Sequence, residues 1–122
     1  MIHYNVWFRF REDADEAEGF EVVRAFLDEL HSAGGVAGYQ LLRNSGHPPK
    51  SKMLPFQALI EFRDEAQFSA AFAAQAASGI HQGLHGRVLS VVGDFHIEVF
   101  RQVAAARSVC PAGAGFQDAC EM

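Results

Sequence analysis

The sequence is poor in cysteine and in long apolar runs, and each scarcity argues against a class of protein. Its two cysteines, Cys110 and Cys120, both lie near the C-terminus. A disulfide-built scaffold needs more cysteines than this, so we expect reduced thiols, with a metal-binding pair as the alternative. No apolar run approaches the roughly 18–20 residues that span a bilayer. The first residues lack the charged-then-apolar pattern of a signal peptide, so we expect a cytoplasmic protein without a membrane partner.

Basic residues are also scarce. Ten Lys and Arg stand against 15 Asp and Glu, which gives a net charge of −5. Phosphate binding requires a clustered basic surface, so we expect no nucleic-acid partner. What the chain has instead is 49% hydrophobic residues, including 11 Phe, over 122 positions. This composition and length favour one globular domain with a modest core.

Four segments favour β-strands. Residues 2–11, 56–63 and 95–103 alternate between apolar and polar side chains, which is the period-two pattern of a strand with one buried face. Residues 36–43 form a weaker strand pattern because Gly38 interrupts it. Gly93 and Asp94 predict a turn into the last strand.

Three segments favour helices. Residues 16–31 carry one wide apolar stripe at helical spacing. The stripe consists of Phe20, Val23, Phe26, Leu27 and Leu30. Residues 65–78 are rich in Ala, a strong helix former, and residues 80–91 predict a separate short helix set at an angle to it.

The order of these segments predicts an α+β domain of the β-α-β-β-α-β type over residues 1–103. Its two main helices should pack on one face of a four-stranded antiparallel sheet, with an extra short helix before the last strand. The first and third strands should take the centre, and the fourth should lie beside the first. Residues 104–122 should form a C-terminal tail that packs on a partner subunit.

Strand alternation then divides the sheet into two faces. The apolar face should lie under the helices and carries Ile2, Tyr4, Val6, Phe8, Ala58, Ile60, Phe62, Phe95, Ile97 and Val99. The opposite face, here called the second face, carries His3, Asn5, Trp7, Arg9, Gln57, Leu59, Glu61, His96, Glu98 and Phe100. An exposed patch that mixes aromatic and polar groups is typical of an interface or a ligand groove. Twofold pairing of two such faces would cover it, so we expect a homodimer.

The second face also holds the candidate catalytic residues His3, His96 and Glu98. A His with a neighbouring carboxylate can transfer protons near neutral pH. Two His and a carboxylate could instead bind a divalent metal, and a structural hydrogen-bond network at a dimer interface is the third interpretation. The residues expected to bind ligand beside them are Asn5, Trp7, Glu61, His81 and His85.

His81 and His85 are four residues apart and would share one face of the short helix. Such a pair binds a metal when a third ligand approaches, and otherwise it lies at a helix surface or at the edge of a pocket. No nucleophile elbow or phosphate loop occurs, which disfavours hydrolase and nucleotide-binding functions.

The opening MIHYNVWFRF, the close GIHQGLHGRVLSVVGDFHIEVFR and the HxxxHG tract within it resemble the dimeric α/β-barrel superfamily of ferredoxin-like folds, in particular an uncharacterised bacterial family. That superfamily includes antibiotic-biosynthesis-type and haem-degrading monooxygenases. The resemblance covers about residues 1–103. It implies a homodimer that binds ligand in the barrel interior or in the cleft between sheet and helices.

Haem-degrading members of that group combine an Asn on the first strand, a Trp near the end of the third strand and a helical His that ligates iron. Asn5 and either His85 or His81 match two of these features. Phe62 occupies the third position, and the single tryptophan is Trp7. The expectation is therefore no cofactor, with haem or a divalent metal as the alternative.

Together these patterns predict a homodimer that binds a small apolar or aromatic molecule, with monooxygenase-like or isomerase-like chemistry. The alternative is a non-catalytic dimerisation module whose polar residues fix the pairing of the two subunits. The sequence does not decide whether the protein is an enzyme.

Overall fold

The computed structural model describes residues 1–46, 51–78 and 83–105. Within these ranges the chain forms four strands and three helices. In chain order they are β1 (Ile2–Phe10), α1 (Glu16–Ser32), β2 (Gly38–Arg43), β3 (Phe56–Phe62), α2 (Glu65–Ser78), α3 (Gly83–Val91) and β4 (Val92–Arg101). This order confirms the predicted α+β fold with its extra short helix. The tail proposed for residues 104–122 lies almost wholly outside the described residues.

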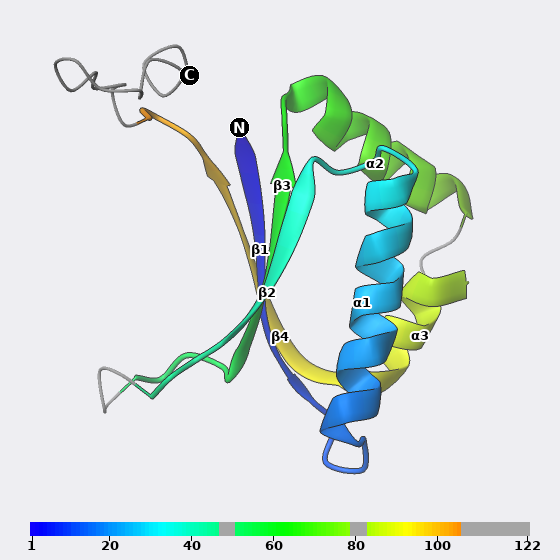
Figure 1. Cartoon of the computed structure of the whole chain (residues 1–122), viewed down its shortest axis with the longest axis vertical. Helices are drawn as coiled ribbons and strands as arrows, with labels where there is room; N and C mark the ends of the chain where they lie inside the picture. The colour runs from blue at the N-terminus through cyan, green and yellow to red at the C-terminus, as the bar shows by residue number, and fades with distance from the viewer. Residues whose placement is uncertain (47–50, 79–82, 106–122) are drawn as a thin grey trace, which may run out of the picture.

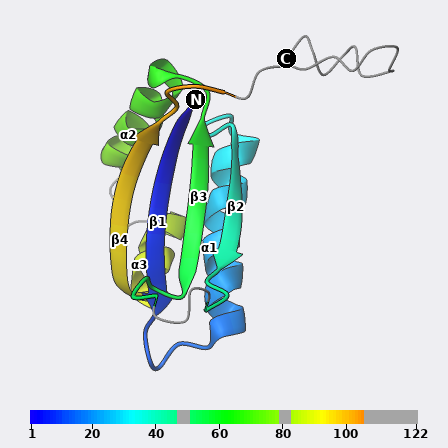
Figure 2. The ribbon, with the colours of Figure 1, turned by 90° about the vertical axis from the view of Figure 1, so that its left-hand side faces the viewer.

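The four strands form one antiparallel sheet in the order β2-β3-β1-β4. This arrangement confirms that the first and third strands are central and that the fourth pairs with the first. All three helices lie on the same side of the sheet (Figure 1). Figure 2 shows the sheet from the other side, with the helices behind it and the second face toward the viewer.

Helix α1 begins and ends where local chemistry requires. Asp15 is its N-cap, and the side chain of Asp15 accepts a hydrogen bond from the backbone N–H of Glu18 at 3.0 Å. Beyond the last turn, Gly34 adopts φ of +78°, a conformation that only glycine takes at low cost. Between these ends the helix buries Val23 and Leu27 against the sheet. Capping and burial thus fix this helix in place over the core.

The core lies between the sheet and the helices. Its buried apolar residues are Ile2, Phe8, Val23, Leu27, Val36, Phe56, Ala58, Ile60 and Phe62. The other strand members of this set belong to the face that alternation assigned to the helices, and Phe56, which pairs with Phe8, extends that face. Among the described residues, no helix is long and apolar enough to cross a membrane.

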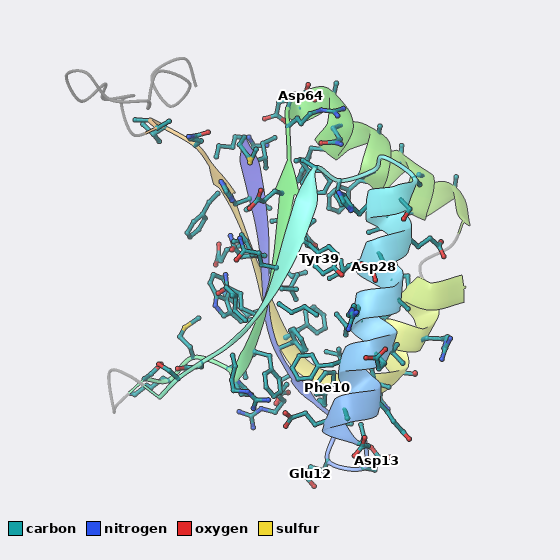
Figure 3. All side chains as sticks on the ribbon, viewed as in Figure 1. Phe10, Glu12, Asp13, Asp28, Tyr39 and Asp64 are labelled. Carbon is teal, nitrogen blue, oxygen red and sulfur yellow. The ribbon has the colours of Figure 1, made fainter. Side chains whose placement is uncertain are left out.

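Four phenylalanines close one end of the layer between sheet and helices. The rings of Phe8, Phe10, Phe20 and Phe56 pack together with centroids 4.8–6.4 Å apart. Figure 3 shows Phe10 at this end, beside the first turns of α1. The Phe10 ring fits there because α1 carries Gly19, where an added Cβ would lie 2.7 Å from a ring carbon.

A buried amide joins the opposite end. The Gln67 side chain accepts a hydrogen bond from the backbone N–H of Arg63 at 2.7 Å and donates one to the carbonyl oxygen of Gly34 at 3.0 Å. It therefore connects the start of α2 to the turn after α1. Buried polar groups are costly unless they are paired. These two hydrogen bonds therefore fix the start of α2 relative to the end of α1.

One predicted boundary is wrong. Gly93 and Asp94 do not form a turn, because α3 ends at Val91 and β4 begins directly at Val92. The extension follows from pairing with the end of β1. Val92 lies opposite Phe10, after a register shift, and the Arg11 N–H donates to the Val91 carbonyl oxygen at 2.9 Å. Backbone pairing with β1 thus keeps Gly93 in an extended strand, although its sequence context predicts a turn.

The close fit at Gly19 gives a testable prediction. Replacing a helical Gly with Ala ordinarily stabilises a helix by about 0.5–1 kcal/mol. Here Gly19→Ala should lower the free energy of unfolding by about 1–3 kcal/mol, because the new methyl group meets the Phe10 ring. Urea denaturation measures the change.

The control is the same substitution in a Phe10→Ala background, where the ring is gone. There Gly19→Ala should regain its ordinary stabilising sign. A stabilising Gly19→Ala in the otherwise unchanged protein would contradict the packing described.

Candidate functional site

A cleft of about 480 Å³ lies between the sheet and the three helices. Its described lining carries no Asp, Glu, Lys or Arg, and its polar side chains are Tyr4, Gln75 and His85. All other lining residues are apolar. A volume of this size, with apolar walls and few polar groups, is typical of small-molecule sites, which usually span about 300–1,000 Å³.

The floor of the cleft is hollow because the side chains in the middle of the sheet are smaller than those beside them. Val6 of β1 lies opposite Ala58 of β3 and Ile97 of β4. The next row toward the phenylalanine cluster has Phe8 between two further phenylalanines, Phe56 and Phe95. Small side chains between bulky ones leave space that the helices above do not fill.

The cleft opens at the β4 edge of the sheet. Its β3 wall is buried, whereas Phe95 and Ile97 on β4 are 55% and 40% exposed. Phe72 on α2, which also lines the cleft, is 44% exposed. We expected Phe95 and Ile97 to lie under the helices; they face the helix side but are not covered.

The positions of the helices explain the opening. Helix α1 lies behind β2 and β3, while α2 and α3 lie behind opposite ends of the β4 side (Figure 2). Tyr39 of β2 and Asp28 of α1 point toward one another across the layer (Figure 3), and the Tyr39 hydroxyl donates a hydrogen bond to the Asp28 carboxylate. At the other edge, Arg101 of β4 donates to Glu65 of α2 at 2.5 Å. These contacts hold the helices at the rim while the middle of the β4 edge stays open.

Tyr4 brings a polar group into the cleft. Its ring packs against Phe68 and Phe72, with centroids 6.4 and 5.4 Å away. Burial raises the pKa of the Tyr4 hydroxyl above its ordinary value, so the group is neutral at physiological pH. Within the described parts of the chain the Tyr4 hydroxyl makes no hydrogen bond. It is therefore available as a donor to a bound molecule.

His85 is the predicted ligand-binding residue that the structure places in the cleft. It lies on α3, and its ring centroid is 5.2 Å from that of Phe26 on α1. His81, its expected partner, falls outside the described residues.

The remaining predicted site residues lie on the second face, as alternation required. Cross-strand pairing puts His3 between Glu61 and Phe100, and four residues further along β1 it puts Trp7 between Gln57 and His96. Asn5, in the row between them, lies opposite Glu98 on β4. The catalytic roles predicted for His3, His96 and Glu98 stay predictions.

Contacts on the second face join some of these residues and leave others apart. His96 Nε2 lies 2.7 Å from a Glu98 carboxylate oxygen, and the His96 ring stacks on Trp7 with centroids 6.1 Å apart. His3 shares no hydrogen bond or ion pair with this pair in the described structure. Accordingly, no three His, Cys, Asp or Glu side chains of the described residues come together as metal ligands. In the described structure His96 and Glu98 thus form a pair, and the three-residue metal site stays an alternative.

Asn5 is the buried polar residue of this face. It is 5% exposed, and its Oδ1 accepts a hydrogen bond from Gln57 Nε2 at 2.8 Å. Its amide nitrogen faces the carbonyl oxygens of His3 and Glu98 at 3.3 and 3.5 Å. Asn5 therefore joins β1 to both of its neighbours, β3 and β4, which is a structural role in addition to the predicted contact with ligand.

Sequence reasoning missed Tyr4 and Gln75, and it offered a cleft between sheet and helices only as one of two places that the resemblance implies. One signal was available, because Tyr4 is the polar residue in the otherwise apolar helix-facing row of β1. No sequence pattern indicated the hollow beside Tyr4, because the hollow depends on the distance between the helices and the sheet.

The architecture is that of the ferredoxin-like proteins, and comparison with known proteins supports this class. Residues 1–110 match the family of unknown function DUF6614, so the chain belongs to that family. No curated protein matches the sequence.

Solved structures with the same fold share little sequence with this chain. At3g17210 from Arabidopsis thaliana has a TM-score of 0.64 and 6% identity, over 87% of this chain and 99% of its own. An antibiotic biosynthesis monooxygenase has a TM-score of 0.57 and 12% identity, over 85% and 100%. A dimeric ferredoxin-like protein of unknown function from Thermobifida fusca has a TM-score of 0.54 and 17% identity, over 83% and 90%. The expected resemblance to ferredoxin-like dimeric proteins is confirmed, and at these identities it shows the fold alone.

The surroundings of Asn5 predict the effect of a single-atom change. Asn5→Asp replaces an amide donor with a carboxylate that faces two carbonyl oxygens. It should lower the free energy of unfolding at neutral pH by about 2 kcal/mol or more, the cost of an unpaired buried charge. The site raises the pKa of the new carboxyl in the folded state, so the loss should shrink as the pH falls toward the ordinary Asp range.

Gln40→Glu is the matched control, because it makes the same amide-to-acid change at an exposed position on β2 opposite Leu59. Urea denaturation at several pH values compares the two. If both substitutions cost the same at neutral pH, Asn5 does not have the role described.

Proposed function

We propose that the protein binds a small apolar or aromatic molecule in the cleft between sheet and helices. The observation that carries the proposal is a hollow of about 480 Å³ whose described lining has no charged side chain and which opens through exposed apolar residues on β4. Water gains few hydrogen bonds in such a space, and apolar hollows in proteins are known to take up apolar molecules instead.

The energetics favour binding of modest strength. An apolar molecule that buries about 250 Å² of surface would gain roughly 6 kcal/mol from removal from water. Part of this gain offsets the loss of translational freedom, so dissociation constants from about 0.1 mM into the millimolar range are expected. The phenylalanine walls also suit an aromatic ring, because ring pairs add a further edge-to-face attraction.

Monooxygenase-like or isomerase-like chemistry stays a prediction. It is supported by the fold shared with an antibiotic biosynthesis monooxygenase. The predicted catalytic residues His3, His96 and Glu98 lie across the sheet from the cleft, so they would act on a molecule held at the second face. Within the cleft, His85 and Tyr4 are the lining groups able to exchange a proton.

We also propose that two copies pair through the second face. Phe100 on this face is exposed, Trp7 is half-buried, and the helices leave the whole face bare (Figure 2). Apolar groups that are exposed beside polar ones on a flat sheet are typical of an interface. The dimeric ferredoxin-like protein from Thermobifida fusca lends support through its fold. Pairing alone, without catalysis, is the alternative function.

Filling the cleft tests binding. Val6→Phe places a ring in the middle of the floor and should weaken binding of N-phenyl-1-naphthylamine, an uncharged fluorescent probe, at least tenfold in a fluorescence titration. Leu59→Phe is the matched control, because it adds a ring on the neighbouring strand but on the second face, and it should leave binding within twofold. Equal binding by the Val6→Phe protein and the unchanged protein would contradict the proposal, provided that both show a cooperative unfolding transition.

A charge on the second face tests pairing. Phe100→Glu should raise the dimer dissociation constant at least thirtyfold, because loss of a central aromatic at an interface commonly costs about 2 kcal/mol or more. Light scattering during gel filtration at micromolar concentration measures the mass. Val103→Glu, at a fully exposed position beyond the end of β4, should leave the dimer intact. A monomeric unchanged protein would contradict this proposal and leave the first untouched.

A further inference from the structure

We propose that the cleft takes an uncharged molecule that bears a carbonyl or ether oxygen, and that the Tyr4 hydroxyl recognises this oxygen as a hydrogen-bond donor. The inference rests on the proposed binding function and names the class of ligand. Two features of the cleft carry it: the absence of charge from its described lining, and the position of one hydroxyl within it.

The lining excludes charged ligands. A carboxylate or ammonium that leaves water without a partner costs several kcal/mol, and the described lining holds no Lys or Arg for a carboxylate and no Asp or Glu for an ammonium. Two arginines at the ends of strands β2 and β4 already have acidic partners. Arg101 pairs with Glu65, and Arg43 pairs with Glu16. Either arginine could serve an anion in the cleft only by leaving its carboxylate.

Tyr4 determines which uncharged molecules fit best. Its ring packs against both Phe68 and Phe72 of α2, and these contacts hold the half-buried residue in the wall of the cleft. A ligand that covers this hydroxyl removes it from water, and this is costly unless the ligand carries an oxygen that accepts its hydrogen bond. A pure hydrocarbon fills the same space but leaves the hydroxyl unpaired. The site should therefore favour a ketone, ester or ether over a hydrocarbon of equal size.

The floor also suggests the shape of the molecule. Tyr4 lies opposite Ile60 near one end of the cleft, and Phe8 closes the other end. The four residues from Tyr4 to Phe8 span about 13 Å at the usual strand rise. An oxygen at Tyr4 would then be followed by an extended apolar chain or a flat ring system over Val6 and Ala58. Medium-chain ketones have these features.

A competition experiment separates this inference from the binding function on which it rests. N-phenyl-1-naphthylamine has no oxygen and reports occupancy, while 2-nonanone and nonanoate at pH 8 compete for the cleft. The unchanged protein should bind 2-nonanone at least tenfold more tightly than nonanoate. Measured relative to the probe, the affinity of Tyr4→Phe for 2-nonanone should be five- to tenfold lower than that of the unchanged protein, the range expected for one lost hydrogen bond.

Tyr39→Phe is the matched control. It removes the other tyrosine hydroxyl of the chain, which bonds Asp28 and does not line the cleft, so 2-nonanone affinity should not change. Equal affinity of the unchanged and Tyr4→Phe proteins for 2-nonanone would overturn the role of Tyr4. Nonanoate binding as tight as that of 2-nonanone would overturn the exclusion of charge. Failure of the probe to bind the unchanged protein would overturn the binding function itself, and this inference with it.

Discussion

The structure depends on one constraint: the sheet has two faces, and helices cover only one of them. Alternation along β1 and β3 sends apolar side chains to the helices and polar or aromatic ones to the second face. Because α2 and α3 stand behind opposite ends of the β4 side, even the covered face is open at one edge (Figure 2). An apolar cleft and an exposed second face both follow from this incomplete covering. The two faces can therefore serve different purposes, with binding on one and pairing on the other.

Most of the fold could be predicted because its signals are local. The apolar stripe of α1 and the period-two pattern of β1 and β3 each report the direction of a side chain, and the structure confirms those directions. The start of β4 could not be predicted in this way. Gly93 reads as a turn residue, but backbone pairing of the neighbouring Val92 with Phe10 extends the strand through it. Pairing between segments more than eighty residues apart overrides a local preference here.

The candidate site was harder to predict for a related reason. Sequence pattern placed His96, Glu98 and Trp7 on one face, and the structure brings them into contact. Sequence pattern does not reveal the distance between the sheet and the helices. The cleft exists because the side chains of Val6 and Ala58 are small and the helices above them do not fill the space. Phe95 and Ile97 show the same limit, since alternation gives their direction but not whether anything covers them. Tyr4 was classed with the core for its position, although its hydroxyl faces a space.

The most direct measurement of the central claim is methyl nuclear magnetic resonance of the protein titrated with 2-nonanone. The methyl groups of Val6, Ala58 and Ile97 report on the cleft, and those of Leu42 and Leu59 report on the second face of the same sheet. Binding in the cleft predicts saturable shifts, and contacts with ligand protons, at the first set and not at the second. Shifts confined to Leu42 and Leu59, or none at either set up to millimolar ligand, would contradict the account.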